Sequence, residues 1–169
     1  MKAALFLTLA LSQAAPALAE TGWRLHEAEA RRFLAPCSQS NARDRHICQT
    51  SQQTFVKVYV DAMAGDLIST VVLVLAFNPP PTDSDYVART SSVGIPPNQI
   101  EACAWTYVLF KTQGHPAAYE DAFVTQCEPV GETGRKAAMM RVKEIAASIN
   151  LGAKPPANWK PSIDGLRDH

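Results

Sequence analysis

The chain has 169 residues, of which 47% are hydrophobic, and carries 16 basic and 16 acidic side chains. This length fits one domain with a hydrophobic core. The balance of charge gives no electrostatic reason to expect nucleic acid or an anionic membrane as a partner.

The N-terminus has the pattern of a secretory signal peptide. Lys2 supplies a positive start, residues 3–11 form a short apolar run, and Ala17-Leu18-Ala19 is a small-x-small cleavage site. The run is much shorter than the roughly 20 apolar residues that span a bilayer. We therefore expect cleavage of residues 1–19, export to the periplasm, and no transmembrane helix in the mature protein.

Four cysteines follow the cleavage site: Cys37, Cys48, Cys103 and Cys127. An even number of cysteines in an exported chain favours two disulfides. Three pairings are possible, and the sequential one is the simplest. Neither C-x-x-C nor C-x-x-C-H occurs, so thioredoxin chemistry and c-type haem attachment lack their motifs. The histidines show no ligand spacing, and we expect no metal and no cofactor.

Two helices are expected before the first clear break. Residues 24–35 are rich in helix formers, and Pro36 ends them. A second helix is plausible from about 43 to 63, and Gly65-Asp66 after it breaks the helix. Its candidate apolar stripe is Ile47, Thr54 or Phe55, Val58 and Ala62.

An apolar run over 67–77 follows and stops at Asn78, before three prolines. Residues 55–60 and 71–75 are rich in β-branched and aromatic residues, which favour strands. Length alone does not separate a buried helix from a strand here. An all-α fold is therefore the main interpretation, and an α+β fold with a hairpin at about 55–77 is the alternative.

After a Pro-rich loop over 78–93, Asn98 is suited to cap another helix, with Glu101 three residues on. The expected buried face of this helix is Ile100, Ala104, and Tyr107 or Val108. Gly114 ends it, and 117–127 forms the next helix. Such a hairpin would bring Cys103 opposite Cys127.

The last expected helix, at about 133–149, has the clearest periodicity. Its apolar stripe is Ala138, Val142, Ile145 and Ile149, and Arg135, Arg141 and Lys143 are available for solvent. The tail over 154–169 is Pro-rich, and we expect it to be extended or mobile. The chain thus divides into a leader over 1–19, a helical domain over 20–153 and this tail.

Small and aromatic residues follow a distinct order between Ala62 and Gly114. Ala62 precedes the Gly-Asp turn, a second Gly turn begins at Gly94, and an A-x-x-W pattern follows. The full set is Ala62, Gly65, Leu73, Gly94, Ala102, Trp105 and Gly114. Over about 58–149 this pattern resembles the Sel1-like repeat family, which is similar to tetratricopeptide repeats. The resemblance implies a short stack of antiparallel helix pairs. The long loop makes this repeat longer than is usual for the family.

Members of this family are mostly adaptors and scaffolds. The resemblance implies an accessory subunit of a bacterial envelope or inner-membrane complex, which binds another exported or membrane protein. The loop and the tail are candidate contacts, with Pro79, Pro80 and Tyr86 in the loop and Trp159 in the tail. No serine lies in a nucleophile elbow, and we expect that the chain is not an enzyme. The alternatives are a cell-wall-related activity, such as β-lactam or peptidoglycan binding, and a small periplasmic inhibitor or immunity protein.

Overall fold

The computed structural model describes residues 22–78, 94–113, 126–149 and 155–161. The expected leader over 1–19, the candidate contacts Pro79, Pro80 and Tyr86, and the turn residue Gly114 lie outside these ranges. The described residues form helices and contain no strand, which confirms the all-α prediction. The hairpin alternative is wrong, because the residues over 55–77 belong to two helices joined by a tight turn.

The two helices in question are α2 (Ala42–Met63) and α3 (Leu67–Phe77). Asn41 caps α2, and the Oδ1 of Asp66 accepts a hydrogen bond from the amide of Ser69 at 2.7 Å to cap α3. Gly65 between them has a φ of 86°, in the left-handed region that favours glycine. The Gly-Asp pair therefore ends one helix and begins the next, as the sequence predicts.

The second half contributes α5 (Gln99–Gln113) and α7 (Gly131–Ile149). The predicted cap of α5 is confirmed, since the Oδ1 of Asn98 accepts from the amide of Glu101 at 3.2 Å. The predicted stripe of α7 is confirmed for Ala138, Val142 and Ile145, which are buried, whereas Ile149 at its end is only partly buried. α7 begins two residues before the expected Thr133, at Gly131, which has a φ of 63°.

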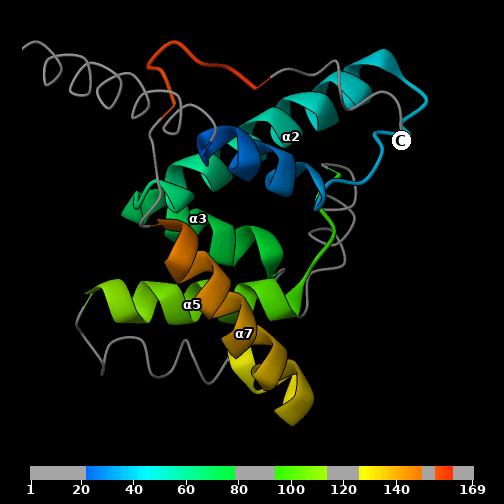
Figure 1. The fold of residues 1–169 in the computed structure, drawn as a ribbon. Coiled ribbons are helices and arrows are strands. Elements are labelled where there is room, and N and C mark those ends of the chain that lie inside the picture. The colour runs from blue at the N-terminus through cyan, green and yellow to red at the C-terminus, as the bar shows by residue number, and fades with distance from the viewer. Residues whose placement is uncertain (1–21, 79–93, 114–125, 150–154, 162–169) are drawn as a thin grey trace, which may run out of the picture.

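Consecutive helices pack against each other, as Figure 1 shows: α3 lies between α2 and α5, and α5 packs on α7. A further helix over 22–31 precedes α2. The core between these helices is aromatic, with ring centroids 5.0 Å apart for Phe33 and Phe77 and 5.7 Å apart for Tyr59 and Trp105. Trp105 is 0% exposed, which confirms its expected place in the core.

The predicted buried faces of α2 and α5 are only partly right. Ile47 and Ile100 are 46% and 38% exposed, while Gln52 and Thr106 are buried. In α5 the six consecutive residues 101–106 are all buried, because neighbouring helices surround this part of it. A helix covered on all sides has no single apolar stripe, so periodicity does not identify its partners.

The expected short solenoid stack of antiparallel helix pairs is not confirmed. In a solenoid each repeat contacts only its neighbours in sequence. Here Arg141 of α7 donates a hydrogen bond to Tyr59 of α2 and forms an ion pair with Glu29, near the start of the described chain. The last helix therefore returns to the first two, and the described helices surround one shared core.

Candidate interaction surface

Two disulfides hold the helical frame. Cys37 pairs with Cys48, with Cα atoms 5.9 Å apart, and Cys103 pairs with Cys127, with Cα atoms 4.9 Å apart. This is the sequential pairing, the simplest of the three. The first bridge ties the segment before α2 to that helix, and the second ties α5 to the residues that precede α7.

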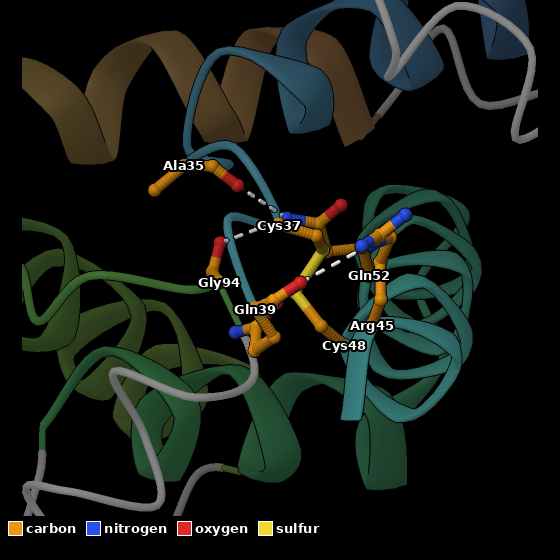
Figure 2. Close-up of a disulfide and its surroundings, with 7 residues drawn as sticks. All are labelled: Ala35, Cys37, Gln39, Arg45, Cys48, Gln52 and Gly94. Carbon is orange, nitrogen blue, oxygen red and sulfur yellow. Dashed lines mark hydrogen bonds between the residues drawn. A yellow bond between two sulfur atoms is a disulfide. The ribbon is translucent and has the colours of Figure 1, made fainter. Parts of the chain in front are cut away.

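Figure 2 shows the first bridge and the chain segments that meet at it. The side-chain amide of Gln52 donates to the backbone oxygens of Ala35 and, at 3.2 Å, of Gly94. The amide of Ala35 donates to the oxygen of Gly94 at 2.8 Å. A Cβ atom at Gly94 would lie 3.0 Å from the sulfur of Cys48 and 2.3 Å from the Gln52 nitrogen. Only glycine fits there, and this tight junction also fixes the position of the next residue, Ile95.

A partly buried charged cluster around Arg141 ties four helices together. Its guanidinium donates to Glu101 at 2.8 Å, to the Tyr59 hydroxyl at 2.6 Å and to Glu144 at 3.0 Å. It also pairs with Glu29 at 2.5 Å. The prediction that Arg141 faces solvent is wrong, since its side chain is only 14% exposed. The helical period of α7 cannot reveal the carboxylates that other helices bring to it.

The surroundings of this cluster shift its pKa values in opposite directions. Burial raises the pKa of Glu101, and Arg141 offsets only part of that effect. Burial also acts to raise the pKa of Glu29, but the hydrogen bond from His26 and the charge of Arg141 outweigh it, so the net pKa is lowered. Tyr59 is 0% exposed, and burial raises the pKa of its phenol. These interactions hold the helices together.

α3 carries no charged residue and only two polar ones, and the described residues cover only half of its surface. Ser69, Thr70, Leu73, Val74 and Phe77 are buried. The opposite half carries Leu67, Ile68, Val71, Val72 and Leu75, of which Ile68 is 74% exposed and Leu75 is 59% exposed. A helix without charged residues is normally buried on most sides, but the described residues leave this face, here called the α3 face, exposed.

A groove of about 440 Å³ runs beside the α3 face, between α3 and α2. Its lining residues from α3 are Val72 and Ala76, and those from α2 are His46, Ile47, Thr50, Ser51, Thr54, Phe55 and Val58. Ile95, which the disulfide junction positions, also lines it. The groove and the α3 face share Val72 and form one continuous apolar surface.

The residues chosen from the sequence mostly have structural roles. Ala62, Leu73, Ala102 and Trp105 are fully buried in the core, and the glycines 65 and 94 occupy turns with positive φ. Trp159, a candidate contact, is half-buried and packs edge-on against Trp23, with centroids 5.1 Å apart. The tail over 155–161 is further held by Gln53, which donates to the oxygen of Pro161 at 3.2 Å. This part of the tail docks on the protein itself.

Sequence reasoning missed the α3 face and the groove. The signal was the mostly apolar run over 67–77, whose composition does not show which side the described residues cover. Among the described residues, no three His, Cys, Asp or Glu side chains form a group that could hold a metal ion. Nor is any helix in the described ranges long and apolar enough to cross a membrane.

Comparisons with family models, with curated proteins and with solved structures found no match for this chain. The resemblance to Sel1-like repeats therefore has no support from relatives.

Proposed function

We propose that this chain is an exported, disulfide-stapled helical module that binds another protein of the bacterial envelope through the α3 face and the adjoining groove. Its role is that of an accessory or scaffold subunit of an envelope or inner-membrane assembly. The observation that carries the proposal is the uncharged α3 helix, which leaves five large apolar side chains exposed. Contiguous apolar surface on this scale marks interaction sites in soluble proteins.

The α3 face has enough apolar surface to contribute substantially to binding. Fully burying a leucine or isoleucine side chain is worth about 1.5–3 kcal/mol. Most of this free energy is still available at Ile68 and Leu75, because 74% and 59% of their surfaces are exposed. Covering both would contribute roughly 2–4 kcal/mol, which is the scale of an interface hot spot.

Export agrees with the cysteine usage. Disulfides form and persist in oxidising compartments such as the periplasm. All four cysteines are paired, and one bridge lies at the junction that positions Ile95 beside the groove. The pairing therefore supports a surface that is rigid before the partner arrives, which lowers the ordering cost of binding. The Sel1-like resemblance is compatible with such a role but does not carry the proposal.

Co-purification from envelope extracts of the native host tests the proposal. Leu75→Glu places a charge on the α3 face at a 59% exposed position, and Met140→Glu is the matched control at a 62% exposed position on α7. We expect Leu75→Glu to lose the partner that wild type and Met140→Glu retain, while all three proteins keep the same helicity and melting temperature. Equal recovery of the same partner by both variants would show that the α3 face is not the binding surface.

A further inference from the structure

We infer that the segment of the partner that binds here is a single amphipathic helix, which lies in the groove between α2 and α3 and contacts it through uncharged aliphatic side chains. This inference rests on the proposed function and specifies its partner.

The spacing of the groove residues suits a third helix. Ile47, Thr54 and Val58 follow one another at helical intervals along α2, and Val72 and Ala76 do so along α3. Two neighbouring helices that expose such rows form the groove into which the ridge of another helix packs. Several lining residues, including Thr50, Thr54 and Ala76, are small, which allows a helix to approach closely.

The chemistry of the groove disfavours a partner in an extended conformation. The hydroxyl of Thr54 donates to the backbone oxygen of Thr50 in its own helix, at 3.0 Å, and so directs its hydrogen-bonding capacity inward. An added strand needs the free edge of a sheet, and the described residues contain no strand. A helix satisfies its own backbone hydrogen bonds and needs only apolar contact from this surface.

The size of the surface favours one helix over a second copy of the chain. Ten residues line the groove and four more exposed residues of α3 flank it, which makes 14 in all. A stable protein–protein interface uses about 20–30 residues on each side. α3 has 11 residues, and at about 1.5 Å per residue its face is about 16 Å long, the length of three helical turns. The surface therefore matches a partner helix of about the same length.

Site-directed photo-crosslinking in the native host tests this inference on the full chain. Benzoylphenylalanine replaces Ile47 or Val72 at the groove, and Met140 on α7 as the control. We expect both groove positions to crosslink to one segment of an envelope protein, at residues three, four or seven apart, whereas the control position does not. A synthetic peptide of that segment should bind wild type, and a mid-segment proline should weaken binding about 100-fold.

The other outcomes separate the two proposals. Crosslinks to a second copy, to lipid, or to partner residues two apart overturn the helix inference, as does a peptide that tolerates the proline. Crosslinks to a partner protein at alternating residues leave the proposed function intact. If neither groove position crosslinks to any protein above the level of the Met140 control, both the helix inference and the proposed function fail.

Discussion

Replacing Arg141 by methionine removes the cation of the partly buried charged cluster while keeping much of the side-chain volume. Glu29 and Glu101, which are 25% and 9% exposed, would then lie near each other without their positive partner. Removing one partner of a buried ion pair costs about 3–5 kcal/mol. For a protein of this size that corresponds to a fall in melting temperature of roughly 10 °C at neutral pH.

The cost of this substitution should depend on pH, with a definite sign. Glu29 has a lowered pKa in the folded protein, so its stabilising contribution is present above its unfolded pKa and is lost as the pH falls through its folded value. Glu101 has a raised pKa because of burial, so its ionised form opposes folding as the pH rises, and this penalty grows without Arg141. Both effects make the difference between wild type and variant largest near neutrality and smaller in acid.

Thermal unfolding followed by circular dichroism, under oxidising conditions at pH 7 and pH 4, measures this difference. Arg135→Met is the matched control, because Arg135 lies on the exposed side of the same helix. We expect Arg141→Met to melt well below Arg135→Met at pH 7 and closer to it at pH 4. If the two variants melt together at both pH values, the charged cluster contributes nothing to the fold and the reasoning is wrong.

Three further outcomes are expected. Trp105→Ala should lower the free energy of unfolding by about 3–5 kcal/mol in a denaturant titration, because the ring is fully buried; an unchanged midpoint would contradict this. Gly94→Ala should lower the melting temperature, since the added Cβ meets the Cys48 sulfur and the Gln52 amide at a left-handed φ; a melting temperature equal to that of wild type would show that the junction relaxes freely. N-terminal sequencing of periplasmic protein should begin at Glu20, and an intact N-terminus would refute the expected cleavage.

Local chemistry made much of the fold predictable. The turn at Gly65 and the cap at Asn98 depend on backbone requirements that few residue types meet, and both are confirmed. The stripe of α7 is visible because only one side of that helix faces the core. By contrast, the surroundings of Arg141 depend on carboxylates from two other helices, which no local pattern contains.

The candidate surface could not be read from the sequence for a similar reason. α3 is mostly apolar and carries no charge, so its composition predicts burial but does not show which half the described residues leave open. The half-burial of Trp159 against Trp23 likewise depends on two segments that are distant in the sequence. Such features follow from the packing of the whole chain.

Hydroxyl-radical footprinting tests most directly whether the α3 face is covered in the envelope. The oxidation of Ile68 and Leu75 would be compared between the purified protein and the same protein in native envelope extracts, with Met140 as the internal reference. We predict that both α3 residues are oxidised in the purified protein and protected in the envelope, while Met140 reacts equally in both. Equal oxidation of Ile68 and Leu75 in the two samples would contradict the claim that a partner covers this face.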